Sequence, residues 1–272
     1  MRLAASLSRH FARHVTPGQV MVASTVGKLS ALLTGDMSDE QAQRLGYETL
    51  LPLRESHGPT LFCFHPASGF AWQFSVLARY LNPRWSITGI QSPRPGPMQQ
   101  CATLDEVIEH HLATLRAQQP HGPYYLFGYS LGGTLAQGIA ARLRAQGEDV
   151  PFLGLLDTWP PETQNWREKE ANGLDPEVLA EIERERQAFL AAQQGQASGE
   201  LFSAIEGNYA DAVRLLTRRT AQPLTVKRRC LLPSAHERWI RTRPGRHGWK
   251  NWRFIARIAL TSISSLRRRL NR

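Results

Sequence analysis

The sequence lacks the features that mark several classes of protein. Its three cysteines, Cys63, Cys101 and Cys230, show no C-x-x-C spacing and do not form an even set, which excludes a secreted disulfide scaffold and a zinc ribbon. No apolar run approaches the roughly 18 residues of a membrane span. Charges interrupt the apolar part of the N-terminal segment MRLAASLSRHFARHV, which is therefore a poor signal peptide. We expect a cytoplasmic protein with reduced thiols and no membrane partner.

Motifs for nucleotides and metals are also absent. The chain contains neither a Walker loop nor a G-x-G-x-x-G fingerprint. Glu109, His110 and His111 lack the H-E-x-x-H spacing of a zinc site, so we expect no bound metal. The 272 residues have an ordinary globular composition, 42% hydrophobic and 8% aromatic, with a mean hydropathy of −0.36. This suits one large domain, or one domain and a fragment of another.

The net charge of +10 is unevenly distributed. Residues 218–272 hold 16 of the 33 Lys and Arg residues and a single acid, Glu237, for a net charge of +15. Residues 1–217 have a net charge of −5. Such asymmetry is typical of an arm that binds nucleic acid or an anionic membrane, and residues 249–257 can form a basic amphipathic helix.

Between these ends, strand and helix patterns alternate. Apolar runs predict strands at 60–64, 85–90, 124–128 and 151–156, and helix spacing occurs at 71–81, 104–119 and 131–146, with a cap at Thr103 or Asp105 for the second helix. Alternating strands and helices predict a doubly wound α/β domain with a mostly parallel sheet, over residues 59–217.

The flanking segments are of other kinds. Residues 1–34 read as two short helices around a break at Thr16-Pro17-Gly18, and residues 35–58 as a polar linker. Residues 162–216 are charged and helical, with Gly173 and Gly207 as breaks. Such an insertion forms either a lid over the site or a solvated helical appendage.

Gly128-Tyr129-Ser130-Leu131-Gly132 is a G-x-S-x-G motif between a predicted strand and a predicted helix. In this context it is typical of a nucleophile elbow, a sharp turn that raises the serine hydroxyl above the sheet. The helix N-terminus and the Leu131 amide favour an oxyanion there. The alternative is an ordinary glycine-rich helix start.

A serine nucleophile needs a base, and the base needs a carboxylate. Asp157 follows the next predicted strand and is the candidate acid, although an Asp there can also cap a turn. After it only His236 and His247 remain, and neither follows a convincing strand. His65 lies in the turn after the first predicted strand, where Ala67 is the most plausible source of a second oxyanion amide.

Four stretches, TLFCFHPASGFAWQFSVLARYL, GIQSPRP, QQPHGPYYLFGYSLGGTLAQGIAARL and FLGLLDTWPPETQNW, resemble the C-terminal thioesterase domains of nonribosomal peptide synthetases that make siderophores. The resemblance runs from about residue 46 to Thr217, and residues 1–34 resemble the last helices of the carrier domain that precedes such a domain. It implies an α/β-hydrolase fold with a helical lid at about 162–216. By the same resemblance, Ser130 is the nucleophile, Asp157 the triad acid, and the Ala67 and Leu131 amides the oxyanion hole.

The resemblance also implies a partner and a substrate. The family's serine takes an acyl chain from phosphopantetheine on a carrier domain and releases it by cyclisation or hydrolysis. The L-G-G-x-S turn that carries phosphopantetheine is absent here, since Leu131-Gly132-Gly133 belongs to the elbow. We therefore expect no cofactor bound in this domain and a carrier domain as the partner.

After Thr217 the resemblance ends, and the family's catalytic histidine falls in the missing part. We hypothesise a shift of reading frame near Thr217. Residues 230–236 and 257–263 can be encoded so that reading two bases later yields FVAERT and DCAHVD, which resemble the family's late strand and its histidine segment. The basic tail, 218–272, would then have no selected function, the last strands would be missing, and no nucleic-acid partner would be expected.

Two other functions remain open. One is an editing thioesterase that clears wrong acyl groups from a partner carrier protein. The other is an inactive module that docks carrier proteins and carries an anion-binding tail.

Overall fold

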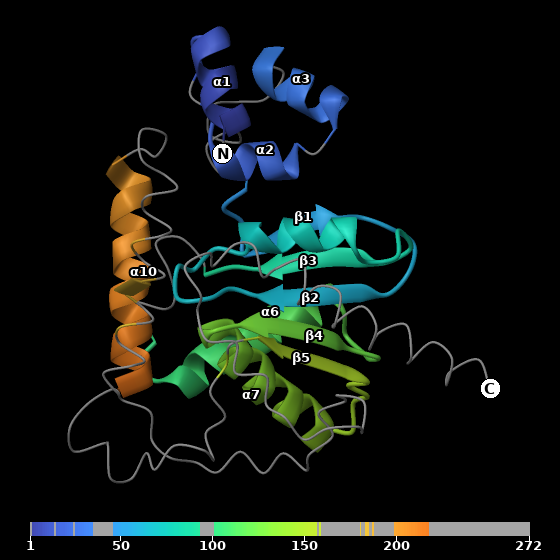
Figure 1. The fold of residues 1–272 in the computed structure, drawn as a ribbon. Helices are drawn as coiled ribbons and strands as arrows, with labels where there is room; N and C mark the ends of the chain where they lie inside the picture. The colour runs from blue at the N-terminus through green and yellow to red at the C-terminus, as the bar shows by residue number, and fades with distance from the viewer. Residues whose placement is uncertain are drawn as a thin grey trace.

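The computed structural model describes residues 2–13, 15–23, 25–34, 46–92, 101–156, 158, 180, 183–184, 187 and 199–217. A five-stranded sheet forms its centre, in the order β1-β3-β2-β4-β5 (Figure 1). The strands are β1 (Leu50–Arg54), β2 (Thr60–Phe64), β3 (Ser86–Ile90), β4 (Tyr125–Tyr129) and β5 (Phe152–Leu156). This arrangement confirms the predicted α/β class, and the four strands expected from the sequence appear within a residue of their predicted limits.

β1 is the one described strand that the sequence did not predict. It lies within the segment interpreted as a linker, and it pairs antiparallel with β3, whereas β2, β3, β4 and β5 are mutually parallel. Pro52 is tolerated because β1 is an edge strand whose outer side needs no donor. Leu51 and Leu53 are buried, and the Arg54 guanidinium donates to the carbonyls of residues 78, 81, 82 and 85.

Helices cover both faces of the sheet. Cys63 pairs with Phe127, so Phe64 and Phe127 point to opposite faces. The ring of Phe127 meets that of Phe74 in η1 (Trp72–Arg79), at 5.7 Å between centroids. The ring of Phe64 meets that of His111 in α6 (Leu104–Gln118), which packs beside α7 (Leu131–Ala145). The helix expected over 71–81 is a 3₁₀-helix, whereas the Thr103 cap of α6 is confirmed by its bond from the Glu106 amide.

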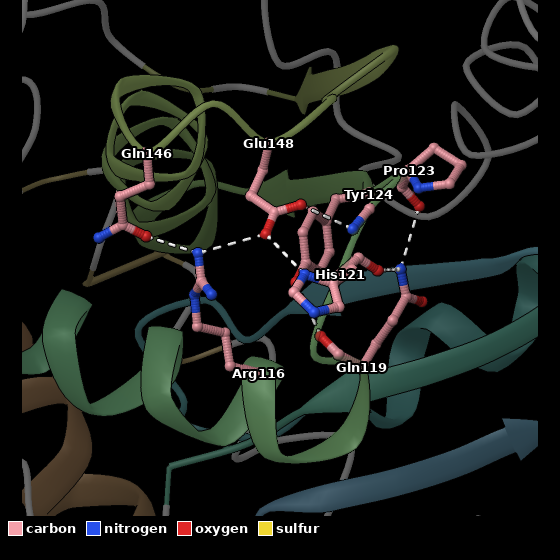
Figure 2. Close-up of polar contacts among 8 residues, drawn as sticks. Arg116, Gln119, His121, Pro123, Tyr124, Gln146 and Glu148 are labelled. Atoms are coloured by element: carbon pink, nitrogen blue, oxygen red, sulfur yellow. Dashed lines mark hydrogen bonds and ion pairs between the residues drawn. The ribbon is translucent and has the colours of Figure 1, made fainter.

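A cluster of polar side chains stabilises the loop between α6 and β4 (Figure 2). Glu148 accepts a hydrogen bond from the Gly122 amide (2.8 Å), which lowers the pKa of its carboxyl group, and pairs with Arg116 at 3.6 Å. Gln119 donates to the carbonyls of His121 and Pro123. The cluster lies at the amino end of β4, so it fixes the start of the strand whose other end leads to Ser130.

The N-terminal segment forms three helices where the sequence predicted two: α1 (Arg2–His10), α2 (Pro17–Val22) and α3 (Val26–Thr34). Thr16-Pro17 starts α2 with a capping box between Thr16 and Gln19. The unpredicted second break arises where Thr25 caps the amide of Lys28. Val15, Ala23 and Leu32 form a small core of their own.

α10 (Gly199–Thr217) is the longest described part of the segment interpreted as a lid. Most of the rest of that segment, with the predicted break at Gly173, lies outside the described residues. The expected break at Gly207 is wrong, because the helix runs through it. Packing of its buried face offsets the free-energy cost of a glycine inside a helix. This face consists of Ile205, Tyr209, Ala212 and Leu215. In Figure 1, α10 (orange) stands beside the end of the sheet where β2 finishes.

Two further expectations concern thiols and membranes. Cys63 and Cys101 are free and buried, and burial raises the pKa of each thiol; Cys230 lies outside the described residues. Within the described ranges no helix is both long and apolar enough to cross a membrane.

Candidate active site

Ser130 occupies a strained position between β4 and α7. Its backbone angles are φ 54° and ψ −124°, and Ala12 is the one other non-glycine residue with a positive φ in the described part of the chain. L-residues rarely adopt this region, which is typical of functional sites that the surrounding structure holds in place. Here the Ser130 amide donates to the Leu156 carbonyl (2.9 Å), and the Gly133 amide donates to the Ser130 carbonyl (3.0 Å). The sequence motif thus becomes a sharp strand–turn–helix bend with a half-buried serine.

Close backbone approaches explain the glycines around Ser130. A Cβ on Gly128 would lie 2.1 Å from the Gly132 carbonyl oxygen, and a Cβ on Gly132 would lie 2.1 Å from that of Phe64. A Cβ on Gly133 would meet the Thr158 hydroxyl at 1.7 Å. The turn can therefore close against β2 and β5 only with glycine at these positions.

We expect Gly132→Ala to lower the free energy of unfolding by about 3 kcal/mol, because the methyl group would meet backbone that cannot move aside. Denaturant melts of the variant and the parent chain measure the difference. Gly27→Ala in α3 is the matched control, since a Cβ there meets nothing within 4 Å. It should be neutral or stabilising by roughly 0.5–1 kcal/mol; equal losses in both variants would refute this account of the elbow.

The end of β5 lies directly against the elbow. Leu156 accepts the Ser130 amide, and the Thr158 hydroxyl contacts the carbonyl oxygens of Ser130 (3.2 Å) and Leu156 (3.1 Å). Asp157, the predicted triad acid, is outside the described residues, although both of its neighbours contact the serine's backbone. The sequence reasoning gave Thr158 no part in holding the serine turn.

The turn after β2 brings the two predicted oxyanion amides into the same region. A Cβ on Gly132 would lie 2.7 Å from the His65 carbonyl oxygen, so the start of α7 abuts this turn. The first amide of a helix, here that of Leu131, has no intrahelical acceptor. The Ala67 amide likewise has no hydrogen-bond acceptor among the described residues. From α10, Asn208 donates to the Ser68 carbonyl (2.9 Å), which links the predicted lid to the turn.

Two histidines beneath this turn are fully buried. His65 Nδ1 lies 2.7 Å from the Pro66 carbonyl oxygen, and its Nε2 lies 3.1 Å from His111 Nε2. Burial lowers the pKa of His65 to about 4, against the raising effect of the Pro66 bond, and burial beside His65 and His110 lowers that of His111. Neither ring is therefore available as the base for Ser130. The sequence gave no sign of this pair, whose members are 46 residues apart.

We expect the pair to make stability depend on pH in a defined direction. The unfolded histidines bind protons near pH 6.5 and the folded ones resist protonation, so stability is complete above about pH 6.5 and declines as the pH falls toward 4. Chemical melts between pH 7.5 and 4.5 should show a steeper decline for the parent than for His111→Gln. His57→Gln, at an exposed site, should leave the slope unchanged; parallel slopes in all three proteins would contradict the expectation.

Within the described ranges, no group of three or more His, Cys, Asp or Glu side chains is placed to hold a metal ion. The parallel sheet, the strained serine at a helix start and the adjacent turn are the features of an α/β-hydrolase site.

Comparison with known proteins identifies the family. Residues 59–258 match the thioesterase domain family, a range that extends past Thr217 into the basic segment. The chain is 75% identical over 228 residues to enterobactin synthase component F of Escherichia coli O157:H7, covering 84% of the chain and 18% of that protein. It is 47% identical over 223 residues to vanchrobactin synthetase VabF of Vibrio anguillarum, covering 79% of the chain and 8% of that protein.

A solved four-domain nonribosomal peptide synthetase, holo-AB3403 bound to AMP and glycine, shares the fold, with a TM-score of 0.52 at 22% identity; the match covers 82% of this chain and 19% of the synthetase. The chain spans about a fifth or less of the curated relatives that it matches. It belongs to the thioesterase domain family, whose members are serine hydrolase-type enzymes with the α/β-hydrolase fold.

Proposed function

We propose that this chain is the releasing thioesterase domain of a siderophore-making nonribosomal peptide synthetase, with Ser130 as its nucleophile. The observation that carries the proposal is the backbone of Ser130, held at φ 54° between β4 and α7 by the Leu156 carbonyl. Such strain is maintained where a hydroxyl must stand clear of the sheet to reach a substrate.

The chemistry is acyl transfer in two steps. The Ser130 Oγ attacks the carbonyl carbon of a thioester, the carbon–sulfur bond breaks, and the hydroxyl proton passes to the departing phosphopantetheine thiol. The Ala67 and Leu131 amides donate to the negative oxygen that forms in between. A hydroxyl of the acyl chain then attacks the ester and closes a lactone, or water attacks and releases an acid. Asp157 would orient the base that moves these protons.

The base limits the rate of this particular chain. His65 and His111 bond each other beneath the turn, and His236 and His247 lie outside the described residues. No histidine among the described residues is placed as a base, and a chain without one keeps only what binding and the oxyanion amides supply, several orders of magnitude below a complete triad. We therefore expect slow acylation of Ser130.

The substrate and partner follow from the family resemblance. The two relatives quoted above are named enterobactin synthase component F and vanchrobactin synthetase VabF. We propose a dihydroxybenzoyl-serine chain as the acyl group, joined as a trimer and closed into a lactone. The partner is a carrier domain that presents this chain on phosphopantetheine, and the domain itself holds no cofactor.

Mass spectrometry with an acyl-loaded carrier protein tests the proposal. A dihydroxybenzoyl-seryl group should move from the carrier to the peptide that contains Ser130, and products should include the cyclic trimer. Faster clearance of an acetyl group than of the seryl chain would instead indicate an editing thioesterase. Carrier binding without any transfer would indicate the inactive docking module.

A further inference from the structure

Hydrogen bonds define the protonation of the buried histidine pair. A carbonyl oxygen only accepts, so His65 Nδ1, 2.7 Å from the Pro66 oxygen, carries a proton. In a neutral ring the other nitrogen then accepts, and His111 Nε2 must donate to His65 Nε2 at 3.1 Å. His111 Nδ1 is left as an acceptor that has no hydrogen-bond partner among the described residues. The chain of donors thus runs in one direction, from α6 through His65 to the Pro66 carbonyl.

The Pro66 carbonyl belongs to the same peptide unit as the Ala67 amide. In a trans peptide the C=O and N–H point in opposite directions within one plane. The carbonyl accepts from two sides, from His65 Nδ1 and from the Gly69 amide at 3.0 Å. Holding the carbonyl therefore also fixes the direction of the Ala67 N–H, which has no acceptor among the described residues.

We propose that His65, supported by His111, is a positioning residue that aims the Ala67 amide at the carbonyl oxygen of the acyl substrate. This inference rests on the proposed function of Ser130. An oxyanion amide contributes to the rate only when its direction is preset, since an amide that must reorient loses most of its advantage. His65 acts on the Ala67 amide through the protein backbone and needs no contact with the substrate.

The placement of the pair favours positioning over simple core filling. Two fully buried imidazoles, one with an acceptor that no described residue satisfies, cost more to bury than apolar side chains of similar size. The hydrogen bond from Asn208 in α10 holds the Ser68 carbonyl, which belongs to the Ser68–Gly69 peptide unit. It therefore does not fix the Pro66–Ala67 peptide unit, which His65 contacts.

Fluorophosphonate labelling of the full chain tests whether His65 positions the Ala67 amide. In this reaction the Ser130 Oγ–P bond forms, the P–F bond breaks, and fluoride and a proton are released. Negative charge develops on the phosphoryl oxygen, which takes the place of the acyl carbonyl oxygen. We expect His65→Leu to lower the maximal labelling rate by about tenfold while half-saturation by the reagent is unchanged. His65→Asn places an amide N–H near the position of Nδ1 and should restore the rate to within about threefold of the parent.

A second pair of variants, at His111, tests the proposal without changing His65, in case the His65 variants do not fold. His111→Met keeps His65 and removes only its supporting donor, whereas His111→Gln can still donate. We expect His111→Met to label more slowly than His111→Gln. Leu115→Ala, a fully buried change on the same helix, controls for lost stability and should label at the parent rate per folded molecule.

The outcomes are separable. Equal labelling of the parent, His65→Leu and His111→Met, measured per folded molecule, would overturn the positioning role and leave the proposed function intact. The same holds if the Asn and Gln variants restore nothing. A parent chain that takes up no label at Ser130 would overturn the proposed function and the positioning role with it.

Discussion

Ser130→Ala should abolish covalent labelling of this chain by a fluorophosphonate, because Ser130 is the residue held with strained backbone angles at the turn between β4 and α7. The expected change is from the slow labelling of the parent chain to no detectable labelling, because the serine oxygen is the atom that forms the new bond. Intact-protein mass spectrometry measures the added phosphonyl group, and peptide mapping locates it.

Ser203→Ala is the matched control, since Ser203 is an exposed serine on α10. It should label at the parent rate. Label that persists in Ser130→Ala would place the reactive group elsewhere and remove the basis for the acyl-enzyme. Because Ser130 packs through its backbone, the substitution should leave the folded structure intact, and melting curves of the two variants should agree with the parent.

Moving the reading frame by two bases at the Thr217 codon should raise the labelling rate on the order of 10⁴-fold. The shifted frame would supply the histidine segment DCAHVD, and with it a base for Ser130. It would also replace the +15 tail and add a late strand beyond β5, which is an edge in the described sheet. We expect the re-encoded chain to be more soluble, since an unpaired edge and exposed core favour aggregation.

Sequencing the encoding DNA across this codon is the first test of the frame-shift hypothesis. A second frame that continues the strands and contains the histidine segment would identify the tail as a wrong-frame translation. If no frame does so, the frame-shift hypothesis is wrong, and the family match through residue 258 applies to the tail as written. His236→Gln and His247→Gln would then show which histidine, if either, is the base.

Local chemistry explains why much of the fold could be predicted. β2 is a continuous apolar run ended by His65-Pro66, and the structure places it at the predicted Thr60–Phe64. The elbow is equally local, because its small residues and its strand and helix are contiguous in the chain. The role of Asp157 stays a prediction, since that residue lies outside the described structure.

The failures have a common physical cause. β1 was missed because its sequence, LLPLR, contains a proline and becomes a strand only by pairing with β3 about forty residues away. Gly207 did not break α10 because packing of the helix outweighs a local loss of propensity of about 1 kcal/mol. Both outcomes depend on partners that are distant in the sequence.

By itself, the sequence determined the parallel α/β class and the sharp turn that holds Ser130, because each depends on residues that are neighbours along the chain. Only the tertiary structure joined His65 to His111, placed Thr158 behind the serine and brought Asn208 to the turn after β2. These contacts link residues 28 to 140 positions apart. They exist because the sheet brings the ends of β2, β4 and β5 together, where burial removes water and strengthens each hydrogen bond.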